Sequence, residues 1–130
     1  MSYTLQSIDV EKYQPHEEYG IPSKEYRSTL RKGDFAKLLF LLSEKRSDGI
    51  WGEYLWVEID RCLAGGRYKG RLKNKPLFVR GVGNGNAIEL GPENVFEIGW
   101  KNKVNITPLE DDILIEPLTT SRRGRPPKKK

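Results

Sequence analysis

Apolar residues along this chain recur mainly with the two-residue period of β-strands. The clearest case is Glu53 to Asp60, where Leu55, Val57 and Ile59 fall on one side. We expect that side to face a core. The opposite side carries Tyr54, Trp56, Glu58 and Asp60.

A second run, Phe35 to Leu42, is apolar on both faces except at Lys37. This pattern predicts a central strand that is covered on both sides, with the N-terminal segment as one cover. A short helix would show the same run of residues. The flanking Gly33 and the Ser47-Asp48-Gly49 turn favour a strand followed by a hairpin.

A hairpin signal at Gly65-Gly66 leads into a further strand, Arg67 to Leu72. Tyr68 and Leu72 share one face of it. The opposite face carries a basic row, which we expect to be exposed: Arg67, Lys69 and Arg71.

Shorter apolar runs predict the remaining elements. Strands are expected at Tyr3 to Ile8, Leu77 to Val79, Ala87 to Leu90 and Val95 to Ile98, with edge strands at Val104 to Ile106 and Ile113 to Ile115. Residues Gly91 to Asn94 form a tight turn. A short helix follows Ser23 as N-cap, with Tyr26 and Leu30 on one face and Lys32-Gly33 as its stop.

These elements predict a mainly β fold, a small SH3-like barrel of five or six strands. Residues 1–31 form an N-terminal extension that carries one short helix and packs on the barrel, which spans residues 32–118. Residues 119–130 form a disordered basic tail, because no large apolar residue in it offsets the entropy cost of ordering.

The charge is unevenly distributed along the chain, whose net charge is +5. Six of the 23 basic residues lie in the last nine positions, which leaves 17 basic and 18 acidic groups before them, a net charge of −1. Residues 61–88 contain seven basic side chains and no acid. Such a segment is either paired with acids across the fold or forms a basic face for an anionic partner.

Composition also limits the environment and the chemistry. A single cysteine, Cys62, excludes an internal disulfide, no signal-peptide pattern is present, and no apolar run approaches the length of a membrane span. We therefore expect a cytoplasmic protein that does not associate with membranes, nucleoid-associated if bacterial and nuclear if eukaryotic.

Motifs for catalysis or cofactors are weak, so we expect no enzyme, no metal and no cofactor. Gly81 to Asn86 lacks the spacing of a dinucleotide loop and precedes a strand, which favours a plain loop. His16 and Cys62 are too few for a zinc site. The acids Glu110 to Asp112 are typical of a solvated loop. Glu53, Glu58 and Asp60 are typical of alternating acids on an exposed strand face.

Exposed aromatic residues offer a further site. Tyr54 and Trp56 would project from the non-core face of their strand and bind a partner or stack on a nucleobase. Packing is the commoner fate, with Trp56 under the N-terminal segment and Trp51 and Trp100 closing the barrel ends.

From Lys32 to Ile98 the chain resembles a group of uncharacterised bacterial domains found among toxin-immunity and other accessory proteins. The resemblance rests on Gly33-Asp34, Gly52-Glu53, Trp56 to Ile59, Tyr68, Gly70, Leu72, Asn74 and Pro76. It implies a compact β-rich binding fold without known catalysis. Members often carry an acidic residue near the position of Asn74. In this chain Lys73 and Lys75 flank Asn74, so a partner of the family need not bind this chain.

The tail resembles the AT-hook of high-mobility-group proteins, because Arg123-Gly124-Arg125-Pro126 repeats its Arg-Gly-Arg-Pro core. The resemblance implies that Arg123 and Arg125 enter the minor groove of A·T-rich DNA, that Gly124 avoids its floor and that Pro126 keeps the backbone extended. Flanking phosphates would be met by Arg122, Lys128, Lys129 and Lys130.

Two functions follow from the sequence. The first is a non-catalytic DNA-associated protein, whose tail contacts duplex DNA while the barrel adds a contact through Arg67, Lys69 and Arg71 or recruits a partner. The alternative is a protein-interaction module, such as an immunity-type or inhibitor protein, whose basic tail is incidental.

Overall fold

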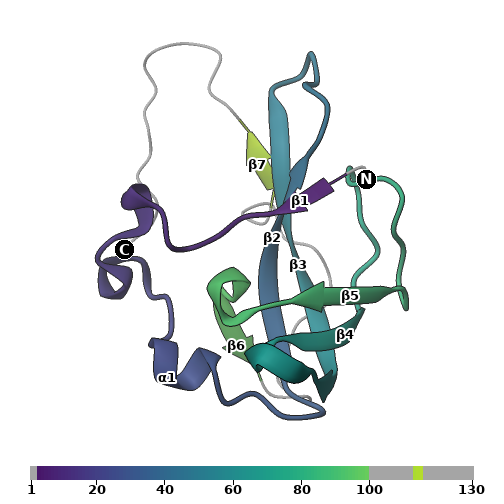
Figure 1. The fold of residues 1–130 in the computed structure, drawn as a ribbon. Coiled ribbons are helices and arrows are strands. Elements are labelled where there is room, and N and C mark those ends of the chain that lie inside the picture. The colour runs from purple at the N-terminus through teal and green to yellow at the C-terminus, as the bar shows by residue number, and fades with distance from the viewer. Residues whose placement is uncertain (1–2, 100–112, 116–130) are drawn as a thin grey trace.

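The computed structural model describes residues 3–99 and 113–115, which form a mainly β fold. Seven antiparallel strands make one curled sheet, a half-barrel, with short helical turns at its edges (Figure 1). The mainly β prediction is confirmed. The sheet is a half-barrel: one described strand comes from the N-terminal extension and six come from residues 32–118, in line with the five or six expected for the barrel.

The long hairpin of β2 (Phe35–Leu42) and β3 (Ile50–Cys62) is the spine of the sheet. β1 (Tyr3–Leu5) and β6 (Glu97–Gly99) pair with opposite ends of β2. β7 (Ile113–Ile115) and β4 (Tyr68–Leu72) likewise pair with opposite ends of β3, and β5 (Ala87–Leu90) extends the sheet from β4. Each end of β2 and each end of β3 therefore pairs with a separate short strand.

The alternation of β3 places its apolar residues as expected. Leu55, Val57 and Ile59 are buried, and they pack with Ala36, Leu38 and Phe40 of β2 in the larger core. Tyr68 and Leu72 of β4 belong to the same core, as predicted. The predicted hairpin at Gly65-Gly66 is confirmed, because η3 (Ala64–Gly66) joins β3 to β4 with both glycines at positive φ.

The second face of the sheet is covered by the N-terminal segment. Ile8, Tyr13 and Ile21 pack on Leu39 and Phe96, partly through the 3₁₀ turns η1 (Glu11–Tyr13) and η2 (His16–Tyr19). β2, which is apolar except at Lys37, is thus a central strand buried on both sides, as its sequence predicts.

The helix α1 (Lys24–Arg27) begins at the predicted N-cap, because the Ser23 hydroxyl accepts a hydrogen bond from the Tyr26 amide. The expected shared apolar face is wrong: the helix ends at Arg27, so Tyr26 is 69% exposed while Leu30 is buried beyond the helix. Arg27 is buried instead, and its guanidinium donates to the carbonyls of Pro22 and Pro92.

Three of the short predicted strands differ from the structure, and the first of them, expected at Tyr3 to Ile8, ends at Leu5 in β1. Leu77 to Val79 is a loop because a buried carboxylate takes its backbone amides, as described below. The predicted turn at Gly91 to Asn94 is the 3₁₀ turn η4 (Pro92–Asn94), and the strand after it begins at Glu97. The edge strand at Ile113 to Ile115 is confirmed as β7, whereas Val104 to Ile106 lies outside the described residues.

Candidate functional site

The tail residues that resemble an AT-hook lie outside the described residues, from Arg122 and Arg123 through Gly124, Arg125 and Pro126 to Lys128, Lys129 and Lys130. The last described residue before them is Ile115 of β7, which pairs with Ile50 at the start of β3. Arg123 follows eight residues later in the sequence.

The basic row on β4 begins beside two acids that come from elsewhere in the sequence. The guanidinium of Arg67 donates to Glu89 at 3.1 Å and to Glu93 at 3.2 Å. The hydrogen bond to Glu89 is the main reason that the pKa of Arg67 is raised above its usual value. Arg67 therefore contributes little net positive charge to this face.

Two further basic residues of the acid-free segment, Lys69 and Lys73, have acidic neighbours. Lys69 lies opposite Glu89 in the β4–β5 register, and Lys73 forms an ion pair of 3.6 Å with Glu58. Arg71 is exposed and donates to the carbonyl of Gly85 at 3.3 Å. For Arg67 and Lys73 the structure confirms pairing across the fold.

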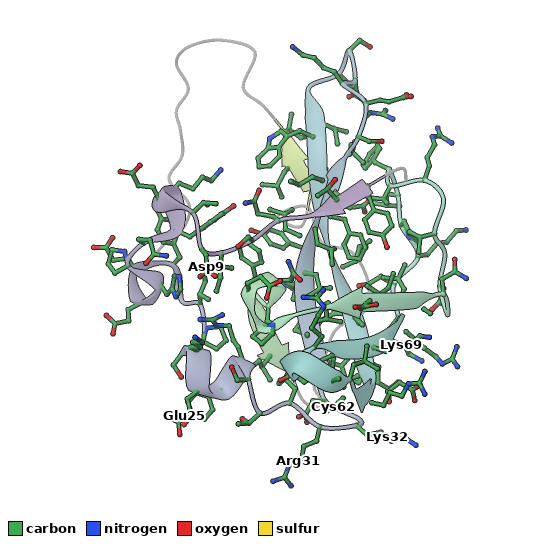
Figure 2. The ribbon with its side chains drawn as sticks, viewed as in Figure 1. Asp9, Glu25, Arg31, Lys32, Cys62 and Lys69 are labelled. Carbon is green, nitrogen blue, oxygen red and sulfur yellow. The ribbon has the colours of Figure 1, made fainter. Side chains whose placement is uncertain are left out.

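Figure 2 shows where the labelled charged side chains lie. Arg31, Lys32 and Lys69 extend outward at the lower end of the sheet near Cys62, whereas Asp9 and Glu25 lie on the N-terminal flank. The exposed thiol of Cys62 contacts the carbonyl of Leu30 at 3.5 Å, and His16 contacts the carbonyl of Ile8 at 3.2 Å. Each of these two residues has its own local partner, so the contacts do not join them into a catalytic pair.

The aromatic pair on β3 is largely packed. Trp56 is only 7% exposed and meets Phe35 edge-on at 6.4 Å between ring centroids, and the ammonium of Lys37 lies 5.2 Å above its ring. Tyr54 packs against Phe96 at 5.4 Å, within the cluster that the N-terminal segment covers. Packing of Trp56 is confirmed, although the N-terminal segment covers Tyr54 rather than Trp56. Trp51 is partly buried against that same cluster, and Trp100 lies outside the described residues.

Glu53, expected on an exposed strand face, is buried in the structure. Its side chain is fully buried, and its carboxylate accepts three backbone hydrogen bonds, from Leu77 at 3.1 Å, Phe78 at 2.7 Å and Val79 at 2.8 Å. The expectation of an exposed acidic strand face is therefore wrong for Glu53. Strand alternation contained the signal, because residue 53 has the same parity as the core residues Leu55, Val57 and Ile59.

A second buried polar side chain fixes the start of the same loop. The side-chain oxygen of Asn74 accepts a hydrogen bond from the backbone amide of Trp56. Asn74 and Glu53 together attach the loop between β4 and β5 to the middle of β3. The loop conformation is thereby fixed at two points, although it contains no strand or helix at these residues.

The glycine-rich part of that loop is a turn. The amide of Gly83 donates to the side chain of Asn86 at 2.6 Å, and the amide of Gly85 donates to the carbonyl of Leu72. The strand β5 follows at once, as predicted, so the helix that a dinucleotide-binding loop requires is replaced by a strand.

The loop and the β2–β3 turn together enclose a groove of about 270 Å³, which we call the turn groove. Its lining is Leu42, Ser43, Glu44, Lys45, Arg46, Phe78 and Arg80. A second hollow of about 260 Å³ shares Leu42, Glu44, Lys45 and Arg46 with it and adds Gly49, Ile50 and Trp51. The two hollows at this turn are thus lined by three cations, Lys45, Arg46 and Arg80, and by the rings of Phe78 and Trp51.

Arg46 organises the turn groove. Its guanidinium forms a forked ion pair with Asp48, with a shortest distance of 2.6 Å, and lies 4.9 Å from the centroid of the Phe78 ring. The hydrogen bond from Arg46 is the largest cause that lowers the pKa of Asp48 to about 2. Asp48 therefore stays ionised over the whole physiological pH range.

Within 3–99 and 113–115, no group of three or more His, Cys, Asp and Glu side chains is placed to hold a metal ion, and Glu110 to Asp112 lie outside these ranges. In that part of the chain, no helix has the length and apolar character needed to cross a bilayer.

No protein-family model, curated protein or solved structure matches this chain. The candidate site is therefore defined by its own chemistry: a basic tail that follows β7 and a cationic groove at the β2–β3 turn.

Proposed function

We propose that this protein is a non-catalytic DNA-associated protein whose C-terminal tail contacts the minor groove of A·T-rich duplexes. The observation that carries the proposal is the Arg-Gly-Arg-Pro sequence at Arg123 to Pro126, set among further basic residues. The minor groove of A·T tracts is narrow and strongly negative, and an extended Arg-Gly-Arg segment places two guanidinium groups in it without a clash from the central residue.

A second contact is part of the proposal, because a single hook binds weakly. Six tail cations neutralise about five or six phosphates, and such binding loses much of its affinity as salt rises. A contact from the half-barrel raises the effective concentration of the tail at the same DNA. The half-barrel either supplies that contact or recruits a partner that does.

The test is a salt titration of binding to A·T-rich and G·C-rich duplexes. We expect the full chain to prefer the A·T duplex by about tenfold, with a slope of log K against log salt near −5, and the variant Arg123→Ala/Arg125→Ala to lose the preference. A chain that ends at Leu118 should lose most of its duplex affinity. Binding that does not depend on the tail would reject the proposal.

A matched control removes the same charge from a different part of the tail. Lys128→Ala/Lys129→Ala takes away two phosphate contacts and leaves the hook core intact, so both duplexes should bind more weakly while the preference remains. Loss of the preference in this control would mean that the tail acts only through its total charge.

A protein-interaction module remains the second candidate, and one observation favours it. Leu77 is 56% exposed although the adjoining backbone is held by the buried carboxylate of Glu53. A large apolar side chain on an ordered loop can bury its surface against a partner protein with little loss of loop entropy. Under this candidate, deletion of residues 119–130 leaves partner binding unchanged and Leu77→Ser abolishes it.

A further inference from the structure

We propose that this protein associates with a second copy of itself through the outer edge of β5, so that the two half-barrels join into one continuous antiparallel sheet. The surface belongs to the half-barrel and needs no DNA. Ala87 and Glu89 form it, through the backbone groups that they turn away from β4 and through the side chains on the exposed face.

The outer edge of β5 is the end of the sheet. Among the described residues, β5 pairs with β4 alone (Figure 1). The amide of Leu72 donates to the carbonyl of Asn86 at 2.9 Å, in the register of the β4–β5 ladder. Hydrogen-bonded positions alternate along an antiparallel strand with positions whose backbone groups point outward. Ala87 and Glu89 therefore point their N–H and C=O groups away from β4.

These outward groups are available for a further strand. Within residues 3–99 and 113–115, no hydrogen bond reaches them from another part of the chain. The side chains of Ala87 and Glu89 are exposed, whereas those of Ile88 and Leu90 are buried in the core, so the strand is already held in an extended shape. An ordered edge with unpaired backbone groups is a template for strand addition.

One register of self-pairing suits this edge. With a twofold axis at Ile88, Ala87 lies opposite Glu89 of the second copy, and the outward backbone groups of both residues are paired. An axis at Glu89 would set two carboxylates opposite each other, which is destabilising. An axis at Ala87 would set Glu89 opposite Gly85, whose amide already donates to the carbonyl of Leu72.

The exposed face carries complementary charges in this register. Arg71 lies opposite Ala87 in the β4–β5 register, and the small side chain of Ala87 leaves room above it. Glu89 of the second copy lies directly beyond Ala87. Arg71 is exposed and donates to the carbonyl of Gly85 at 3.3 Å, so its long side chain can extend across Ala87 to this carboxylate. The twofold axis makes the same contact twice.

The neighbouring charges leave this contact open. Glu58 lies opposite Arg71 on β3, but its carboxylate is 3.6 Å from the ammonium of Lys73. Arg67 binds Glu89 through one carboxylate oxygen at 3.1 Å, which leaves the second oxygen for Arg71 of the other copy. Each interface carboxylate thus lies between two cations, and no two like charges are opposed.

A dimer of this kind carries two C-terminal tails. Two hooks on one particle bind a single duplex more tightly than one hook does, because the second binds at a high effective concentration. This consequence rests on the proposed function. It identifies the partner that the half-barrel recruits as a second copy of the chain.

Sedimentation velocity of the full chain without DNA measures the association, at concentrations from about 5 to 500 µM. A joined strand edge buries less surface than a standard interface, so we expect a dissociation constant of about 50 µM. Ala87→Pro removes an outward N–H and leaves the ladder to β4 intact, so it should raise the dissociation constant by at least about tenfold.

Two substitutions of cations test the charge contact. Arg71→Ala removes the group that meets Glu89 of the second copy and should raise the dissociation constant by about fivefold. Lys73→Ala is the matched control, because it removes a cation that is paired with Glu58 away from the edge, and it should change the constant by less than about twofold. Far-ultraviolet circular dichroism checks folding, and Arg71→Ala decides the test if Ala87→Pro does not fold.

The results that overturn the inference are distinct from those that overturn the proposed function. A mass that stays monomeric at about 500 µM rejects the dimer. So does a dimer that neither Ala87→Pro nor Arg71→Ala weakens, or one that is lost when the chain ends at Leu118. Because DNA is absent, these results leave the proposed function standing, and that function fails only in the duplex titration.

Discussion

At the scale of single residues, stability depends on positions where one added side-chain atom would collide with buried backbone. Gly70 is the sharpest case, because it lies in β4 where the pairing with β3 shifts register after Ile59. A Cβ at this position would lie 2.5 Å from the carbonyl oxygen of Glu58 and 2.6 Å from a methyl group of Val57. Only glycine lets the two strands approach so closely.

We predict that Gly70→Ala lowers the free energy of unfolding by about 1–3 kcal/mol, because a neighbouring backbone atom must move to admit the methyl group. Urea denaturation measures the loss. Gly83→Ala is the control, since its nearest neighbour would be the Asn86 side chain at 3.9 Å, and it should change stability by less than about 0.5 kcal/mol. Equal effects of the two substitutions would mean that the close approach at Gly70 is not limiting.

At the scale of elements, the loop between β4 and β5 depends on hydrogen bonds to one side chain rather than on a strand ladder. The three amides of Leu77, Phe78 and Val79 donate to the carboxylate of Glu53, which no solvent reaches. Because hydrogen bonds to a charged acceptor are stronger than neutral ones, this single residue replaces several ladder bonds.

We predict that Glu53→Gln lowers the free energy of unfolding by about 2–3 kcal/mol, because the amide group of glutamine turns a donor toward at least one backbone N–H. Amide exchange at residues 77–79 should accelerate at the same time. Glu58→Gln on the same strand removes only a partly exposed ion pair with Lys73, so it should cost less than about 1 kcal/mol. Unchanged exchange rates in Glu53→Gln would contradict the role assigned to the carboxylate.

At the scale of the whole molecule, net charge and folding are carried by different parts of the chain. The residues before the tail carry a net charge of −1, and both hydrophobic clusters are built from residues 3–99 and 114. DNA binding, under the proposed function, draws instead on the cations after residue 121.

We predict that truncation after Leu118 leaves the free energy of unfolding within about 0.5 kcal/mol of the full chain, because the tail has no large apolar residue to bury. The urea midpoint and the m-value together provide the measurement. A loss above about 1 kcal/mol would show that the tail packs on the body, and the duplex-binding comparison would then need the point variants alone.

The sequence by itself determined the mainly β class, the β2–β3 spine, the N-cap at Ser23 and the core side of β3. Each of these is a local property, set by alternation, by turn residues or by one side chain that meets a nearby amide. Even the burial of Glu53 could be predicted from the sequence, because two-residue alternation places it on the same face of the strand as Leu55.

Only the tertiary structure decided which charges and amides meet across the sheet. It brought Glu89 and Glu93 to Arg67, placed the amides of residues 77–79 on Glu53, and set Lys45 and Arg80 on one groove. These partners are separated by more than twenty residues in the chain, and no local pattern encodes which distant groups will meet. Their pairing follows from the curl and register of the sheet, which the packing of the whole core fixes.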